Sequence, residues 1–316
     1  MKSLVILIIL GVFSVQIQAQ ENQTIKNENE EYIDKLSESI DDIKLILDTL
    51  YEDYYVIRGE GVAGNIGVYV GESGVYMIDN QWSALSERLK EMIASITEKP
   101  IKLIINSHFH FDHTNGNLAF GRDGIPILAH NKARERMQKR QVLHGHNSEV
   151  QNPYPSNALP TLTFEDKMVL HDGQETIELK YCPNAHTDGD IIVHFEKADI
   201  YHMGDIFVTY GIPVIDPDGG GDIYALIETI DYTIANSKST SIFIPGHGQV
   251  CSKKELIVFS ELLHLILDSV EESVKKGENL KQTILDTKRN IGKGVGGINK
   301  DKFITLVHQM VIKRNK

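Results

Sequence analysis

The hexapeptide His108-Phe109-His110-Phe111-Asp112-His113 places three imidazoles and one carboxylate within six consecutive positions. It follows the apolar run Ile101-Lys102-Leu103-Ile104-Ile105, whose β-branched residues predict a buried strand. The hexapeptide therefore begins at the carboxyl end of a strand, and on extended backbone His108 and His110 point the same way. Turn-forming residues come next, in Thr114-Asn115-Gly116-Asn117.

This concentration of polar side chains beside a buried strand predicts a metal centre. Burying imidazoles and a carboxylate without partners costs free energy, so a shared metal ion is the simplest common partner. Imidazole and carboxylate ligands together suit zinc best, followed by iron or manganese.

The hexapeptide resembles the HxHxDH motif of the metallo-β-lactamase superfamily. Three further motifs of that family follow in the family's order, between about residues 43 and 250: His186 in Ala185-His186-Thr187-Asp188-Gly189-Asp190, Asp205 in Gly204-Asp205-Ile206-Phe207, and His247 in Pro245-Gly246-His247-Gly248. Chance accounts for one such motif but not for four in order, which argues against the alternative that these are scattered core or surface residues.

The resemblance implies an α/β fold, the metallo-β-lactamase αββα sandwich, in which helices flank two mixed β-sheets. It also implies two zinc ions per chain, with iron or manganese as alternatives. One metal ion would be held by His108, His110 and His186, the other by Asp112, His113 and His247, and Asp205 would bridge them. Asp79, which ends the strand-like run Gly74–Asp79, would support the ligands from behind.

The same resemblance implies a hydrolase in which a metal-bridged hydroxide attacks the carbonyl of a β-lactam, amide or ester. Asp112 would lie beside this nucleophile and take up its proton as the catalytic residue. The best-known metallo-β-lactamases carry Cys or Ser where this chain has Asp205, whereas Asp is usual in lactonases and glyoxalase II-like thiolesterases. A lactonase or thiolesterase is therefore the alternative. An iron-dependent oxygenase and a non-enzymatic binding protein are disfavoured, because all seven ligand positions are filled.

Residues 1–19 have the pattern of a signal peptide, with basic Lys2, an apolar stretch from Leu4 to Val15 and a cleavage site after Ala19. An uncleaved membrane anchor is the alternative. The apolar stretch is shorter than the roughly 20 residues that a spanning helix needs, so cleavage is favoured. We expect a periplasmic or secreted protein without stable membrane insertion after cleavage.

The remaining chain divides into a polar segment at 20–42, the metallo-β-lactamase domain at 43–250 and C-terminal helices at 251–316 that pack on the same domain. The polar segment contains a predicted short helix from Tyr32 to Ile40, followed by a strand. Residues 142–160 form a long Asn- and Pro-containing stretch without periodicity, which is typical of a binding loop or lid. His144 and His146 in this stretch are interpreted as surface or substrate-facing residues. Strands are expected to stop after Val250.

Composition narrows the class of partner. Apolar residues make up 41% of the chain, enough for a sizeable core. The formal net charge of −12 disfavours nucleic acid, because phosphate backbones need basic partners, and leaves a small-molecule substrate. Cys182 and Cys251 either form a disulfide, which an exported compartment permits, or remain two free thiols, the interpretation favoured here.

Overall fold

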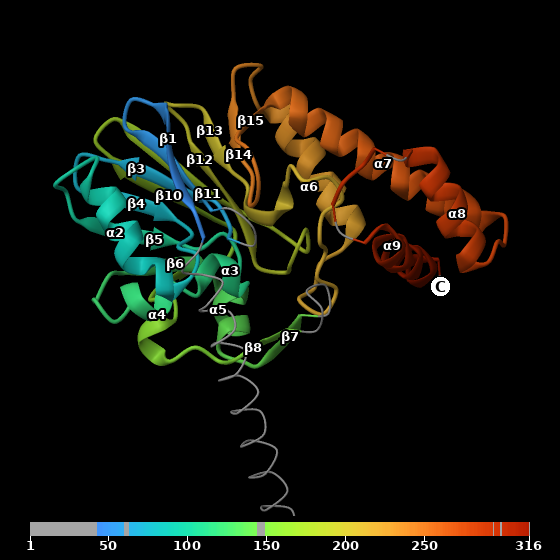
Figure 1. The fold of residues 1–316 in the computed structure, drawn as a ribbon, viewed down its shortest axis with the longest axis horizontal. Coiled ribbons are helices and arrows are strands. Elements are labelled where there is room, and N and C mark those ends of the chain that lie inside the picture. The colour runs from blue at the N-terminus through green and yellow to red at the C-terminus, as the bar shows by residue number, and fades with distance from the viewer. Residues whose placement is uncertain (1–42, 60–62, 144–148, 293, 298, 316) are drawn as a thin grey trace, which may run out of the picture. The chain divides into compact units, whose positions relative to one another are not determined.

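The structure, a computed structural model, describes residues 43–59, 63–143, 149–292, 294–297 and 299–315. Residues Lys44–Lys316 form one compact unit, drawn in Figure 1. The expected signal peptide at 1–19, the polar segment at 20–42 with its helix from Tyr32 to Ile40, and the residues His144 and His146 lie outside the described residues.

The first sheet contains seven strands in the order β1-β2-β3-β4-β5-β6-β9. β1 to β4 pair in antiparallel fashion, whereas β4, β5, β6 and β9 are parallel to one another. The strand predicted after Ile40 is present as β1, and the apolar run before the hexapeptide is β5. The strands are β1 (Leu45–Tyr51), β2 (Tyr54–Gly59), β3 (Ile66–Val70), β4 (Val75–Ile78), β5 (Ile101–Ile105), β6 (Ile127–His130) and β9 (Leu162–Phe164).

The second sheet contains six strands in the order β10-β11-β12-β13-β14-β15, and only β13 and β14 are parallel. The expectation that strands stop after Val250 is wrong by one short element, because β15 extends the sheet edge through two residues paired with β14. The strands are β10 (Lys167–Asp172), β11 (Glu175–Cys182), β12 (Asp190–Phe195), β13 (Ile200–His202), β14 (Ile242–Ile244) and β15 (Cys251–Ser252).

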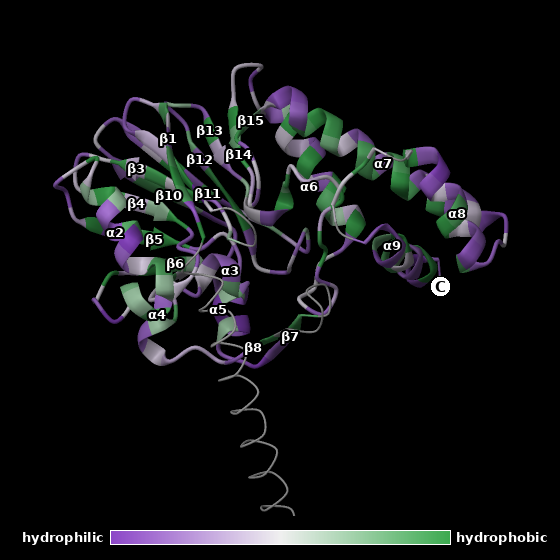
Figure 2. Cartoon of the chain, viewed as in Figure 1, coloured by the Kyte–Doolittle hydropathy of each residue, from purple (hydrophilic) through white to green (hydrophobic). Residues whose placement is uncertain are grey.

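The two sheets pack face to face over an apolar core. β11 alternates buried and partly buried residues, as a strand with one covered face does, and it directs Ile177 and Leu179 toward Val56 and Ile105 of the first sheet. Figure 2 shows the apolar residues concentrated along these strands. Burial of this shared face is what holds the two sheets together.

Helices cover both outer faces, which completes the expected αββα sandwich (Figure 1). The first sheet is covered by α2 (Ser86–Ala94), α4 (Asn117–Phe120) and α5 (Asn131–Met137), and the second by α6 (Ile223–Asn236) and α7 (Lys253–Lys275). The chain ends in α8 (Leu280–Ile291) and α9 (Lys300–Arg314), which pack with α6 and α7 around a second apolar core. Ser252 begins α7 with a capping box completed by Glu255.

The stretch at 142–160 is not the structureless loop that its sequence predicts. A short hairpin of β7 (Gln141–Leu143) and β8 (Glu149–Gln151) opens it, and the 3₁₀ turn η3 (Ser156–Ala158) closes it. Strands of three residues are too short to show a periodic pattern, so the pairing is invisible in the sequence.

Two further observations concern the cysteines and the apolar character of the helices. Cys182 and Cys251 are both free thiols, as the favoured interpretation expects. Among the described helices, none combines the length and apolar composition that crossing a bilayer requires.

Candidate metal centre

The residues of the four sequence motifs meet where parallel strands end. The hexapeptide follows β5, Asp205 follows β13, and His247 follows β14, so their carboxyl ends open onto the same edge of the sandwich. His186 comes from the loop between β11 and β12. The backbone of the hexapeptide changes conformation after His110, which is still extended. The short helix α3 (Phe111–Thr114) begins there, and it turns Asp112 and His113 back toward the strand ends.

Two groups of side chains direct nitrogen and oxygen atoms at common points. The first cluster is His108, His110, His186 and Asp205, and the second cluster is Asp112, His113 and His247; within each, the candidate ligand atoms lie within 4.8 Å of one another. All of these side chains are buried except His247, which is 13% exposed. The structure therefore brings together all seven residues that the sequence predicts as ligands, in two groups, with Asp205 grouped with the three histidines of the first cluster.

The nitrogen and oxygen atoms within each cluster lie as close together as atoms that share one small partner, such as a proton or a metal ion. In the first cluster, Nε2 of His186 lies 3.0 Å from Nδ1 of His110. In the second, Nε2 of His247 lies 3.2 Å from Nε2 of His113 and 3.1 Å from Oδ2 of Asp112. Imidazole nitrogens whose lone pairs face each other repel unless a proton or a cation lies between them.

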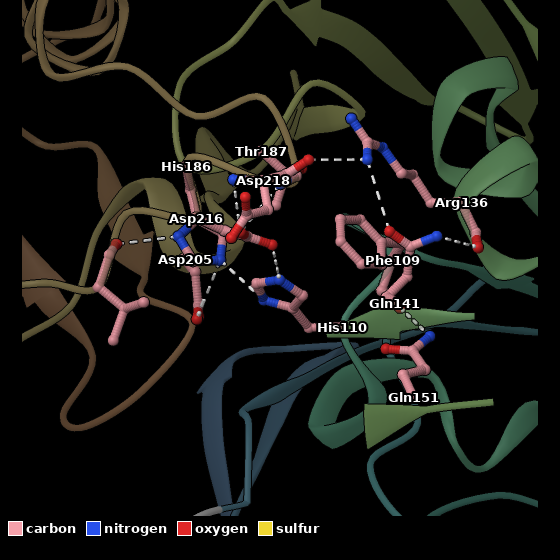
Figure 3. A network of polar contacts seen from close by, with 12 residues as sticks. Phe109, His110, Arg136, Gln141, Gln151, His186, Thr187, Asp205, Asp216 and Asp218 are labelled. Atoms are coloured by element: carbon pink, nitrogen blue, oxygen red, sulfur yellow. Dashed lines mark hydrogen bonds and ion pairs between the residues drawn. The ribbon is translucent and has the colours of Figure 1, made fainter. Parts of the chain in front are cut away.

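Asp205 stands between the two clusters. Its Oδ1 lies 3.1 Å from Nε2 of His113, and its Oδ2 lies 3.7 Å from Nε2 of His186. One carboxylate thus presents one oxygen to each cluster. Figure 3 shows Asp205 beside His186 and His110.

Each imidazole of the first cluster is also held by its outward-facing nitrogen. Nδ1 of His108 lies 3.0 Å from Oγ of Ser107, and Nδ1 of His186 donates to the carbonyl of Val214 at 2.9 Å. These partners accept a hydrogen bond from the protonated outer nitrogen, so the inner nitrogen keeps its lone pair directed into the cluster.

Asp79, which directly follows β4, contacts residues of both clusters from behind, as the family resemblance implies. It accepts hydrogen bonds from the backbone N–H and the hydroxyl of Ser107, both at 2.7 Å, and from Nδ1 of His113 at 2.8 Å. Because Ser107 in turn contacts His108, this fully buried carboxylate orients one imidazole of each cluster. Its φ of +65° is a left-handed conformation that Asp tolerates better than most residues.

Asp216 supports the first cluster, although no motif in the sequence pointed to it. Its Oδ2 lies 3.0 Å from Nε2 of His110, and its Oδ1 accepts the backbone N–H groups of Asp218 and Gly219 at 3.1 and 2.9 Å. Burial raises the pKa of Asp216, but the hydrogen bond and charge of His110 outweigh burial and bring the pKa to about 2. The only signal in the sequence is Asp216-Pro217-Asp218-Gly219. These residue types indicate a turn in any loop and do not point to a functional site.

Arg136 links two loops beside the centre (Figure 3). From α5 it forms a two-pronged ion pair with Asp188, with Nη2–Oδ2 at 2.7 Å, and donates to the carbonyl of Asp218 at 2.8 Å. Gln151 of the β7–β8 hairpin donates to the carbonyl of Phe109 at 2.9 Å. The predicted binding loop thus contacts the hexapeptide through a hydrogen bond. The Arg136 guanidinium contacts the two loops that carry His186 and Asp216.

The electrostatics of the centre fit a divalent cation. Nε2 of His108 and Oδ1 of Asp112 are buried and have no hydrogen-bond partner within the described part of the chain. Leaving such an atom unpaired costs about 1 to 3 kcal/mol. Burial and the neighbouring His113 and His110 hold the pKa of His108 well below its usual range, so its inner nitrogen stays unprotonated. Imidazole lone pairs and carboxylates converging in this way form a donor set for a divalent metal.

Histidines of the framework lie apart from the two clusters. His130 ends β6, accepts the backbone N–H of Lys132 at the start of α5 and stacks on Tyr181 with ring centroids 3.8 Å apart. His194 stacks on Tyr201 in the same manner.

Comparison with known proteins places this geometry in a family. The family model for the metallo-beta-lactamase superfamily matches residues 59–251, more than half of the chain. The chain is 28% identical over 201 residues to the 2,4-dinitroanisole O-demethylase subunit alpha of Nocardioides sp. (strain JS1661), a match that covers 61% of this chain and 55% of that subunit. It is 26% identical over 203 residues to a probable metallo-hydrolase of Methanocaldococcus jannaschii, covering 61% of this chain and 92% of that protein. The chain therefore spans little more than half of the demethylase subunit.

Solved structures share the fold at low sequence identity. A metallo-beta-lactamase from Pontibacter korlensis superposes with a TM-score of 0.58 at 17% identity, covering 70% of this chain and 99% of that one. A stereoselective inverting sec-alkylsulfatase from Pseudomonas sp. superposes with a TM-score of 0.64 at 14% identity, covering 84% of this chain and 50% of that one. With four motifs gathered into two clusters of candidate metal ligands on this fold, and with the family model matched over them, the chain belongs to the metallo-β-lactamase superfamily.

Proposed function

We propose that this protein is an exported hydrolase that binds two zinc ions per chain and cleaves a carbonyl compound. One observation carries the proposal: the carboxylate of Asp205 presents Oδ1 to His113 and Oδ2 to His186, one oxygen to each cluster. A mononuclear site needs only one of the two clusters. The second cluster, with its own imidazoles and the Asp112 carboxylate, has the composition of a second ligand set.

Under this proposal, His108, His110 and His186 hold one ion, Asp112, His113 and His247 hold the other, and Asp205 bridges them. Three neutral imidazoles favour zinc over iron or manganese for the first ion. When bound, the ions supply Lewis acidity and a water molecule whose pKa lies near neutrality. Two carboxylates offset part of the charge of two divalent cations.

Asp112 is the proposed general base. Its Oδ2 is held by Nε2 of His247 at 3.1 Å, while Oδ1 is buried without a hydrogen-bond partner among the described residues. Burial raises the pKa of Asp112, but the charges of His113 and His247 and the hydrogen bond from His247 outweigh burial and lower it below its usual range. The carboxylate is therefore ionised at neutral pH, and Oδ1 can accept the proton of the attacking water.

The proposed substrate class follows from what an activated water molecule can attack. Suitable targets are the carbonyl carbon of a β-lactam, another amide or an ester. A lactonase or thiolesterase is the second candidate, and Asp205 is the observation that favours it, since the best-known metallo-β-lactamases have Cys or Ser at that position. The name of the dinitroanisole demethylase subunit adds aryl methyl ethers to the compounds worth assaying. The acidic chain favours a small molecule over nucleic acid.

A panel of chromogenic substrates tests the proposal. The purified protein, loaded with zinc, is offered a cephalosporin, a lactone, a thioester, an aryl ester and an aryl methyl ether. We expect turnover of one carbonyl class, loss of turnover after chelation and recovery when zinc is returned. Turnover that survives complete removal of metal would contradict the proposal, as would iron-dependent oxygen consumption in place of hydrolysis. Export is tested separately, by fractionation of cells that express the full chain.

A further inference from the structure

One segment contacts three of the candidate ligands, His110, His186 and His247. Residues 208–216, called here the support segment, begin shortly after Asp205. Val208 forms a parallel bridge with His247, and Thr209 donates its backbone N–H to the carbonyl of His247 at 3.2 Å. Farther along, the support segment provides the Val214 carbonyl that accepts from His186 and the Asp216 carboxylate that contacts His110. Its position therefore sets the orientation of imidazoles in both clusters.

The support segment is docked on the loop between α8 and α9. The backbone N–H of Ile212 donates to the carbonyl of Gly296 at 3.1 Å, and Ile212 forms a parallel bridge with Gly297. This contact joins two stretches more than 80 positions apart in the sequence, and Figure 1 shows the link from α8 to α9 passing beside the loop that leads into α6.

Only glycine fits where these two stretches touch. A Cβ at Gly296 would lie 2.6 Å from the carbonyl oxygen of Tyr210, and a Cβ at Gly211 or Gly297 would overlap the backbone of the opposite stretch. Gly211 and Gly297 also have φ values of +114° and +105°, which favour glycine. Because the obstructing atoms belong to backbone, no side chain can swing away to make room. We call Gly211, Gly296 and Gly297 the glycine junction.

An apolar core beneath the junction ties it to the C-terminal helices. Ile212 is fully buried in the same cluster as Ile291 at the end of α8 and Phe303 and Ile304 in α9. A shift of α8 or α9 would therefore move the support segment, since protein interiors transmit displacement through close packing. Both helices lie beyond residues 59–251, where the family model matches.

We infer that the C-terminal helices set the metal affinity of the centre, by clamping the support segment through the glycine junction. This inference rests on the proposed function in one respect, that the two clusters bind metal. Within the part of the chain that the structure describes, the atoms nearest to the junction glycines belong to the opposite backbone stretch and not to a candidate ligand, so these glycines act as positioning residues. Outer partners of metal-binding histidines typically change metal affinity by about 10-fold to 100-fold when they are disturbed.

The test compares Gly296→Val with Gly294→Val. Both substitutions enlarge a glycine of the same loop, but a Cβ at Gly294 meets nothing within 4 Å. Zinc affinity is measured by competition with a chromophoric chelator, and hydrogen exchange of the support segment is followed in the metal-free protein. We expect Gly296→Val to weaken zinc binding by about 10-fold or more and to speed exchange of residues 208–216, with the strand amides unchanged. Gly294→Val should match the parent in both measurements.

A second pair keeps the inference testable if Gly296→Val does not fold. Gly297→Ala and Gly292→Ala both place alanine at a positive φ, but only Gly297 abuts backbone. The inference predicts weaker zinc binding for Gly297→Ala alone. Equal zinc affinity within both pairs would overturn it while leaving the proposed function intact. A parent protein that binds no zinc would instead defeat the proposed function and this inference together.

Discussion

Asp216 lies 3.0 Å from Nε2 of His110, although 106 positions separate the two residues in the sequence. The carboxylate holds the outer nitrogen of an imidazole whose inner nitrogen faces His186. Carboxylate–histidine pairs of this kind fix the tautomer and ring orientation of a metal ligand. Residues 208–216 therefore contribute to the first cluster without supplying one of its candidate ligands.

Removing this carboxylate should weaken one metal site more than the other. We predict that Asp216→Ala lowers the affinity of the first cluster for zinc by about 10-fold to 100-fold, because His110 loses the group that orients it. Chelator competition on the purified protein measures the effect. Asp218→Ala is the matched control, since it removes an exposed carboxylate from the same turn. Equal zinc affinities for the two variants would show that Asp216 does not support the centre.

Asp112→Asn preserves the size of the side chain but removes its capacity to accept a proton as a base. We predict a fall in kcat of about 10²-fold to 10⁴-fold, the usual contribution of a general base. The melting temperature of the metal-free protein should change little by comparison, because the asparagine fills the same buried space. A variant that keeps the turnover of the parent would end the assignment of Asp112 as the catalytic base.

His247→Ala removes the one candidate ligand that is partly exposed. The first cluster does not depend on this imidazole, so we predict that zinc content falls from about two equivalents to about one per chain. Elemental analysis after dialysis gives the number directly. His264→Ala, which removes a surface histidine on α7 that pairs with Asp231, should retain the parental content. Two equivalents in His247→Ala would mean that the second site is composed differently.

His130 predicts part of the pH dependence of folding. Burial lowers its pKa below 6.5, and protonation would place a second donor against the N–H of Lys132. The unfolded chain therefore binds the proton more readily, so this stabilisation is present above about pH 6.5 and is lost as the pH falls through the lower folded pKa. His130→Asn keeps an acceptor for the helix cap but does not titrate in this range.

The comparison is made on metal-free proteins, because ligand protonation adds its own pH dependence. Denaturant unfolding at a series of pH values should give a flatter stability profile below pH 6.5 for His130→Asn than for the parent. Parallel profiles would exclude His130 as the source of that dependence.

Much of the site was predictable because its ligands lie in short, local motifs. The hexapeptide follows a β-branched run that forms β5, and Asp79 directly follows β4, which is parallel to β5. The place of the hexapeptide follows from the strand pattern, and the role of Asp79 follows from family resemblance. The structure gathers these candidate ligands into two clusters, with Asp205 facing both; whether they bind metal stays a prediction.

What the sequence did not reveal depends on contacts between distant segments. Asp216 reads as a turn residue until folding brings it to His110, and Gly296 and Gly297 read as loop residues until they meet the backbone of Tyr210 and Ile212. The β7–β8 hairpin was not predicted for a different reason. Strands of three residues carry too few side chains to show an alternation of apolar and polar residues.

The most direct test of a dinuclear hydrolase is the metal content of the purified protein. Elemental analysis after exhaustive dialysis should find two zinc ions per chain, one for each cluster that Asp205 faces. A single equivalent of zinc would contradict the dinuclear centre. A single iron in place of zinc would contradict the hydrolytic assignment as well.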